Sequence, residues 1–460
     1  MKKTAIVYGT LSPLRKKAIE MLTTLLLDYT YEYLPCYADE SEVPEGYRKI
    51  YLGTPESNPY IKPSGLTHAE EYRITVSGED VWIEGADDHG VLYGAVDFYN
   101  KYIAPVENPP HDRYWINPFE RPFPDFELTS APSVRDRGIW TWGHVIYDYR
   151  GFFDNMVKCK MNTVVIWNDH APLNAREMID YAHSCGIKLF WGFPWLWDTS
   201  CKKFTLKDIE GAPESIFNYY EKNYANLGAD GIYFQSFTEV REETIEGKLI
   251  AEVVTDFVNK TAALLYEKHP DLKIQFGLHA TSVKDRLSFL QKVDPRMYIV
   301  WEDCGAFPYS YIPSRVDNFD ETVAFTKEIA VLRGKDDRFG VVTKGLTKLD
   351  WKQFEHLQGS LYTGVSSKFM KADRVLRKNR IWRSLQARWL RFGKYAYEMA
   401  KVLSASKDGD LMVLSLVEDG MFEENIMFPV ALYSEMLWDA DKDYDRLVES
   451  VAFRNYVTFA

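Results

Sequence analysis

One segment of the chain, from Ala229 to Glu239, ends an apolar run with polar side chains. The apolar part is typical of a buried strand, and Gln235, Thr238 and Glu239 follow it. In a parallel barrel, the carboxyl ends of the strands carry the catalytic groups. Glu239 is therefore a candidate proton donor. The competing interpretation is that Glu239 only caps the following helix, because acidic residues stabilise helix N-termini.

Polar and aromatic residues stand at the ends of the other predicted strands as well. Those that we expect to bind substrate are Trp142, His144, Trp167, Asn168, Asp169, His170, Trp195, Gln235, His279, Trp301, Tyr309 and Lys344. If the strands form a barrel, these groups converge on one face. Indole rings suit the C–H faces of a sugar ring, and acids and amides suit its hydroxyls. For each aromatic residue alone, packing in the core is the alternative.

A second carboxylate is needed for glycosidic cleavage, as base or nucleophile beside the proton donor. Glu302, Asp303 and Glu418 stand at the ends of the sixth and eighth predicted strands and compete for this role. Aromatic surroundings would raise the pKa of a buried Glu239 and keep it protonated near neutral pH. These residues predict a glycoside hydrolase that needs no cofactor.

Other chemistries have weaker support in the sequence. His144, His170 and His279 could bind a metal with Asp169, but no HxH or HExxH spacing is present, so we expect no metal. A metal there would indicate an isomerase or lyase, since fold does not determine function. No GxSxG turn occurs, and Cys304 has no clear histidine partner in the sequence.

The elements that position these residues follow a regular alternation after Arg137. Strands are predicted at 138–142, 162–167, 187–192, 230–236, 273–278, 297–301, 338–342 and 411–416. Helices are predicted between them, for example at 149–160, 174–185, 245–268 and 319–333, with a long helical stretch from about 370 to 404. Residues 137–460 therefore predict an α/β fold, a (β/α)8 TIM barrel. A doubly wound open sheet is the alternative, but no GxGxxG turn follows any strand.

Residues 1–103 read as a small α+β domain. Strands are predicted at 4–8, 49–53, 71–76 and 80–84, with helices at 14–28 and 90–102. Residues 104–136 are rich in proline and aromatic residues, which predicts an extended connector, because proline fixes φ and removes a backbone donor. An exposed aromatic connector could support a homodimer.

Composition limits the function further. Hydrophobic residues make up 46% of the 460 residues, which predicts a packed core, and the net charge of −12 argues against nucleic acid as the main partner. None of the five cysteines forms a CxxC pair, so reduced thiols in the cytoplasm fit best, and a periplasm is also compatible. No signal-peptide h-region and no 18-residue apolar stretch are present, which predicts no membrane partner.

The first domain resembles the small domain that precedes the barrel in family 20 β-hexosaminidases and family 67 α-glucuronidases. The resemblance is carried by Val81–Ala95 and by Ile50–Gly53. It implies a glycosidase barrel and places Glu239 as the general acid, with a carboxylate on a later strand as the base. In an α-glucuronidase-like enzyme, Lys344 and Arg241 could pair with a uronate carboxylate; the alternative for both is a surface salt bridge.

One position departs from the family 20 pattern. Those enzymes place an Asp before the acidic Glu, where it orients the substrate acetamide, whereas this chain has Thr238. The sequence therefore predicts an exo-acting glycoside hydrolase that cleaves a terminal hexosaminide- or uronide-type sugar from an oligosaccharide or glycoside. The alternative is a catalytically inactive barrel that binds carbohydrate.

Overall fold

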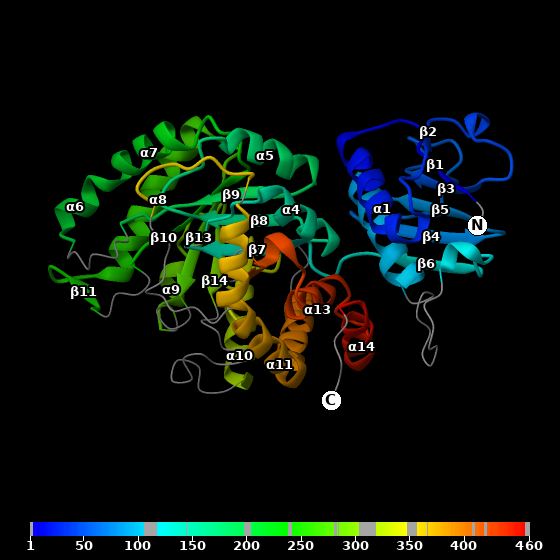
Figure 1. The fold of residues 1–460 in the computed structure, drawn as a ribbon. Helices are drawn as coiled ribbons and strands as arrows, with labels where there is room; N and C mark the ends of the chain where they lie inside the picture. The colour runs from blue at the N-terminus through cyan, green and yellow to red at the C-terminus, as the bar shows by residue number, and fades with distance from the viewer. Residues whose placement is uncertain are drawn as a thin grey trace. The chain divides into compact units, whose positions relative to one another are not determined.

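The structure is a computed structural model. It describes residues 3–104, 117–143, 145–196, 204–237, 242–279, 283, 285–302, 319–346, 357–365, 367–406, 410–417 and 421–455. The chain divides into two compact units, one built mainly from the chain up to Ser133 and one mainly from Val134 to Asn455 (Figure 1).

The first unit contains a six-stranded sheet. Its strands are β1 (Thr4–Val7), β2 (Cys36–Tyr37), β3 (Arg48–Gly53), β4 (Tyr72–Ser77), β5 (Asp80–Gly85) and β6 (Phe126–Ser130), in the order β2-β1-β3-β5-β4-β6. The helical elements are α1 (Pro13–Thr30), α2 (Asp88–Asp97), the 3-10 turns η1 (Glu40–Glu42) and η3 (Pro118–Glu120), and the π-helical η2 (Phe98–Ile103). The predicted α+β organisation agrees with these elements.

Strand β6 lies within the stretch that the sequence predicted to be a connector. It pairs antiparallel with β4, with Ile74 opposite Leu128, and so completes the sheet of the first unit. Its side chains alternate between half-buried and exposed, as expected for an edge strand with one face covered. The proline-rich composition around it concealed a short strand that contributes to the sheet.

The second unit is a closed barrel of eight parallel strands. They are β7 (Asp136–Trp142), β8 (Thr163–Trp167), β9 (Lys188–Gly192), β10 (Gly231–Gln235), β13 (Lys273–His279), β14 (Tyr298–Glu302), β15 (Phe339–Thr343) and β16 (Leu411–Leu416). Every strand consists mainly of buried residues, which is typical of a parallel sheet covered on both faces. The predicted (β/α)8 barrel with a preceding domain is confirmed.

Helices lie around the outside of the barrel (Figure 1). They are α4 (Tyr149–Lys158), α5 (Ala175–Ser184), α6 (Leu206–Glu210), α7 (Ala212–Asn223), α8 (Ile250–Lys268), α9 (Leu287–Leu290), α10 (Phe319–Ala330), α11 (Lys368–Ser406), α12 (Met421–Glu424), α13 (Phe428–Trp438) and α14 (Tyr444–Arg454). Helix α8 begins five residues later than predicted, because β11 (Thr244–Ile245) and β12 (Lys248–Leu249) form a hairpin before it.

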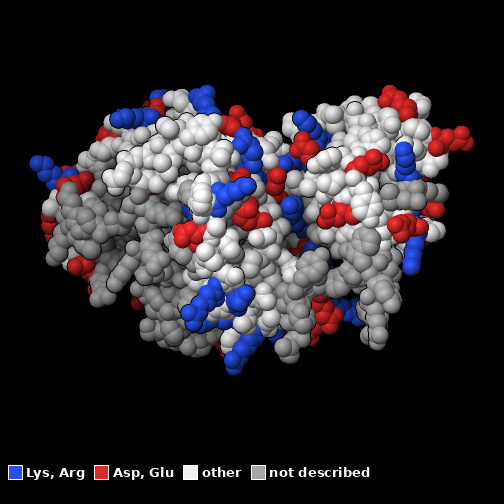
Figure 2. Space-filling view, viewed as in Figure 1, with Lys and Arg blue, Asp and Glu red and all other residues white. Residues whose placement is uncertain are grey.

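Two surface properties bear on the expected partners. Among the described helices, none combines the length and the apolar composition that a bilayer span requires. On the face shown in Figure 2, Lys and Arg side chains are interspersed with Asp and Glu rather than gathered into one basic field.

Candidate active site

The alternation of the barrel strands determines which side chains face the interior. Inward-facing residues form one buried cluster: Trp140, Trp142, Val165, Trp167, Phe190, Tyr233, Tyr298, Val300, Val342, Met412, Leu414 and Leu416. These side chains fill the barrel, as in other (β/α)8 folds. In β10, β13 and β14, the same alternation continues to Gln235, His279 and Glu302 at the carboxyl ends of the strands.

Three indole rings form an aromatic wall beside these polar groups. Trp140 stacks on Trp142 with ring centroids 5.5 Å apart, and Trp142 lies 4.8 Å from Trp167. The ring of Tyr233 meets Trp140 and Trp167 edge-on at 5.6 and 5.8 Å. Gly192 on β9 leaves room for this arrangement, because a Cβ there would lie 2.8 Å from the Trp167 ring. The predicted positions Trp142 and Trp167 thus lie together at the carboxyl end of the barrel.

Glu302 is the centre of a buried polar network at the same end. Its side chain is fully buried, and Lys344, which follows β15, forms an ion pair with Oε2. The Tyr233 hydroxyl donates a hydrogen bond of 2.6 Å to Oε1, and the Gln235 amide donates to the same oxygen. The approach of Tyr233 requires Gly277 on the neighbouring strand, since a Cβ there would overlap the Tyr233 hydroxyl. Side chains from β10 and from the residue after β15 therefore meet at this carboxylate of β14, and Gly277 of β13 leaves room for one of them.

The charge state of Glu302 follows from this network. Burial raises the pKa of Glu302, but the charges of Lys344 and His279 and the hydrogen bonds from Lys344 and Tyr233 outweigh it and hold the pKa below its usual value. His279 stands directly opposite Glu302 in the pairing of β13 with β14. Glu302 is consequently an ionised carboxylate whose charge is offset inside the barrel, and it cannot serve as a proton donor at neutral pH.

Two of the predicted tryptophans do not reach the barrel interior. Trp195 is fully buried, stacks on Phe234 with centroids 3.6 Å apart, and lies near Phe257 of α8. Trp301 is 2% exposed and packs edge-on against Phe325 of α10. Phe234 and Trp301 alternate with the inward-facing residues, so their side chains point to the helical layer. Both tryptophans belong to the core, which corrects their assignment to substrate binding.

The loop after β8 carries three further predicted residues. Asn168 and Asp169 are half-buried and His170 is exposed. The Asp169 carboxylate accepts a hydrogen bond of 2.8 Å from the backbone N–H of Leu357, and Asn168 and His170 line a small cavity with Leu357 and Leu361. These contacts place the three residues beside the segment 357–365, and Asp169 has a role in holding that segment.

The backbone is strained after two neighbouring strands. Leu196, after β9, has φ of 55°, and Phe237, after β10, has φ of 53°. Left-handed backbone is unfavourable for bulky L-residues and clusters at functional sites. Phe237 lies two residues before Glu239 in the sequence, so the strain occurs where the sequence predicts the proton donor.

Several predicted residues lie outside the described part of the chain. They are Glu239, Asp303, Glu418, His144 and Tyr309, together with Thr238 and Arg241. Their assigned roles therefore remain predictions. Among the described residues, no three His, Cys, Asp or Glu side chains gather as a metal site.

Two elements of the site were not identified from the sequence. Tyr233 sits inside an apolar run, and only the alternation with Gln235 could have indicated that it faces the interior. Glu423 of α12 accepts backbone N–H groups of Tyr147 and Asp148 at 3.2 and 2.8 Å and forms an ion pair of 3.1 Å with Arg374 of α11. Burial raises the pKa of Glu423 to about 7, partly opposed by these donors. Glu423 thereby holds the loop that follows β7.

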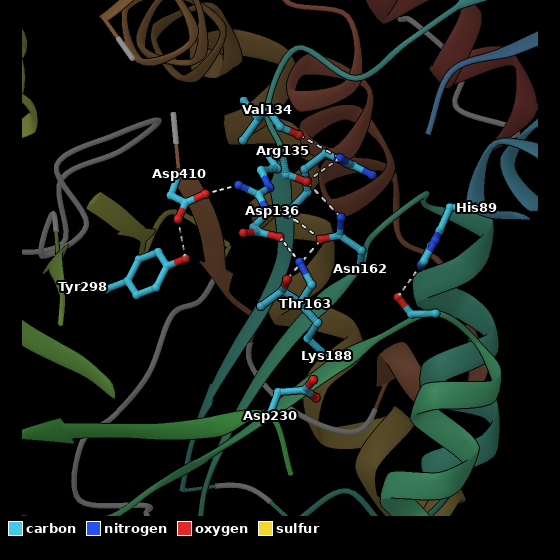
Figure 3. Close-up of polar contacts among 12 residues, drawn as sticks. His89, Val134, Arg135, Asp136, Asn162, Thr163, Lys188, Asp230, Tyr298 and Asp410 are labelled. Carbon is cyan, nitrogen blue, oxygen red and sulfur yellow. Dashed lines mark hydrogen bonds and ion pairs between the residues drawn. The ribbon is translucent and has the colours of Figure 1, made fainter. Parts of the chain in front are cut away.

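The opposite end of the barrel carries a different set of polar contacts (Figure 3). Asp136 pairs with Lys188, the Asn162 amide donates to the Arg135 carbonyl at 2.9 Å, and Asp410 pairs with Arg135. These residues stand at the amino ends of β7, β8, β9 and β16. Polar groups at that face join the strands and contribute stability, whereas chemistry occurs at the carboxyl face.

Neither a protein-family model nor a curated protein matches this chain. Solved structures do resemble it. A mutant β-hexosaminidase of Streptomyces plicatus in complex with product GlcNAc has a TM-score of 0.59 at 11% identity, over 99% of this chain and 91% of that one. A β-N-acetylhexosaminidase from Bacteroides fragilis has a TM-score of 0.54 at 13% identity, over 100% of this chain and 93% of that one.

Two longer enzymes also resemble the chain. A family 115 4-O-methyl-α-glucuronidase with specificity for decorated arabinogalactans and a family 138 enzyme targeting pectin rhamnogalacturonan II each have a TM-score of 0.56 at 14% identity. The comparisons cover 98% and 96% of this chain but only 58% and 65% of those enzymes, so the chain spans less than two thirds of their length. At these identities the comparisons show a shared fold, the glycosidase-like barrel with an additional domain.

Proposed function

We propose that this chain is an exo-acting glycoside hydrolase that removes a terminal sugar of the hexosaminide or uronide type. The observation that carries the proposal is the ionised Glu302 at the carboxyl end of the barrel, oriented by Tyr233, Gln235 and Lys344 beside a wall of indole rings. Such a combination can hold both the hydroxyls and the apolar face of a sugar. The shared fold with glycosidases, including hexosaminidases and an α-glucuronidase, supports it.

We assign the roles of the carboxylates from their positions in the sequence after the barrel strands and, for Glu302, from its contacts. Glu239 is assigned as the general acid, because it follows β10 at the catalytic face. Both oxygens of Glu302 are contacted by protein groups, so we assign it to the floor of the sugar site rather than to attack on the sugar. Asp303 and Glu418 remain the candidates for base or nucleophile, since each follows a barrel strand within two residues.

The test compares wild type, Glu239→Gln and the control Glu242→Gln on aryl N-acetylhexosaminides, glucuronides and neutral hexosides. General acid catalysis contributes roughly 10²–10⁴ in rate, so Glu239→Gln should lose about that factor on substrates with poor leaving groups. The loss should be smaller for dinitrophenyl glycosides, whose leaving group needs little protonation. Glu242 is exposed and close in sequence, and its replacement should leave turnover unchanged. Equal turnover by wild type and Glu239→Gln would remove Glu239 from the mechanism.

The second candidate function is a barrel that binds carbohydrate without cleaving it. It is favoured by the contacts of Glu302, whose Oε1 accepts hydrogen bonds from Tyr233 and Gln235 and whose Oε2 pairs with Lys344, and by Thr238 in place of an Asp. Saturable binding of a sugar without turnover of any aryl glycoside would support this function.

A further inference from the structure

The floor of the candidate site carries two opposite charges that offset each other. Glu302 is fully buried, Lys344 is 2% exposed, and the Lys344 ammonium contacts the Glu302 carboxylate. Lys344 also lies 5.6 Å from the centre of the Trp140 ring. Within the described residues of this floor, Glu302 offsets the charge of Lys344, and His279 stands opposite Glu302 in the pairing of β13 with β14. Lys344 is therefore not an uncompensated cation for a substrate, and the floor offers it hydrogen-bonding groups.

We propose that this floor selects a neutral terminal sugar, a hexose or an N-acetylhexosamine, over a uronic acid. The inference rests on the proposed glycosidase function and narrows its substrate class. A uronate carboxylate needs a cationic partner, preferably one free to form charge-assisted hydrogen bonds. At this floor it would meet Lys344 only in competition with Glu302, and the two like charges would repel each other at short range in a region of low dielectric constant.

The remaining groups of the floor suit hydroxyls. Gln235 is 4% exposed and donates its amide N–H to Glu302, while the amide oxygen makes no hydrogen bond within the described residues and can accept one from a sugar hydroxyl. The indole N–H of Trp140 is buried and has no acceptor in the same part of the chain. A sugar hydroxyl can accept from it, although the buried indole N–H groups of Trp191, Trp195 and Trp301, outside this floor, also have no acceptor within the described residues. Trp142, which stacks on the buried Trp140 and is 9% exposed, is the more accessible of the two rings for contact with an uncharged sugar ring.

The deciding variant is Glu302→Gln, which keeps the size of the side chain and removes its charge. Lys344 would then be an unneutralised cation at the floor, and preference should move toward uronates. The matched control is the double variant Glu302→Gln/Lys344→Gln, whose floor has neither charge and should show no gain for uronates. Comparing the single variant with the double variant separates the effect of the Lys344 charge from the effect of lost packing.

The measurement uses pairs of ligands that differ only at C6: glucose and glucuronate, and galactose and galacturonate, with GlcNAc as a further neutral sugar. Binding is followed by calorimetry at pH 8, where an ordinary histidine is neutral, and turnover is followed on the corresponding aryl glycosides. Wild type should favour the neutral member of a pair at least tenfold, and Glu302→Gln should shift the ratio at least tenfold toward the uronate.

The outcomes distinguish this inference from the proposed function. If wild type prefers a neutral sugar and Glu302→Gln shifts the binding ratio toward the uronate, but no aryl glycoside is turned over, the selectivity inference is supported and the proposed hydrolase function is overturned. If wild type turns over a uronide in preference to the neutral glycoside, and this turnover depends on Glu239, the proposed hydrolase function is supported and the selectivity inference is overturned. Failure of wild type to bind any of the five sugars overturns the inference. If Glu302→Gln does not fold, the wild-type ratio alone decides, and a preference for the uronate refutes the proposal.

Discussion

Replacing Lys344 by Met should destabilise the barrel strongly, and by an amount that depends on pH. Lys344 and Glu302 have side-chain exposures of 3% and 0%, so the substitution leaves a buried carboxylate without its ammonium partner. Removing one member of a buried ion pair costs about 3–5 kcal/mol. The hydrogen bonds from Tyr233 and Gln235 and the nearby His279 remain, so we expect a cost near the lower end, about 3 kcal/mol at pH 8.

The pH dependence follows from the pKa of Glu302. In wild type this pKa is lowered, so ionised Glu302 contributes stability above its unfolded pKa of about 4.3, and this contribution is lost as pH falls through the folded value. Without Lys344, the effect of burial is opposed by fewer groups, and the folded pKa rises. The cost of Lys344→Met should therefore be largest at pH 8 and shrink as the pH falls.

Urea unfolding followed by tryptophan fluorescence measures this cost. Of the 13 tryptophans, only Trp82 and Trp115 precede Val134, so the signal reports mainly the barrel. Lys268→Met is the matched control, because Lys268 pairs with Glu221 but its side chain is 58% exposed, and it should cost at most about 1 kcal/mol. Adding Glu302→Gln to Lys344→Met should recover most of the loss. A cost no greater than that of Lys268→Met, or one that does not change with pH, would refute the reasoning.

Two further predictions concern the same end of the barrel. Gly277→Ala should displace Tyr233 and cost about 1–3 kcal/mol in unfolding free energy. The control Gly211→Ala, where the nearest atom would be 3.9 Å from the new Cβ, should change the unfolding free energy by no more than about 1 kcal/mol. Equal effects of the two variants would contradict the close packing of Tyr233 against Gly277. Because the pKa of Glu423 is raised to about 7, its contribution to stability should be complete below about pH 4.3 and lost as pH rises through 7. Replacing Glu423 by Gln should therefore remove about 4 kcal/mol of this pH dependence. The measurement is the difference between variant and wild-type unfolding free energies from pH 4 to 8, and identical pH profiles would show that Glu423 does not titrate in this range.

The strands of the barrel could be located from the sequence because their signal is local. The predicted strand 411–416 coincides with β16, and 138–142 lies within β7. A buried parallel strand is a short apolar run between turn residues, and both features are visible without knowledge of the fold. Helix α8 was predicted to begin at 245, because the helical periodicity gave no indication of the hairpin before it; Glu246 and Gly247 have positive φ there.

The sequence alone thus determined the order of the elements, the barrel, and the end of each strand where polar side chains gather. It could not determine which side of a strand faces the interior, because both sides of a parallel strand are buried and apolar. This is why Trp301 was assigned to the site although it contacts α10, and why Tyr233 was missed. Tertiary structure also decided the partner of Lys344. The parallel pairing of β15 with β14 places Lys344 beside Glu302, 42 positions earlier in the chain, and Glu302 offsets the charge of the ammonium that the sequence had left available to a uronate.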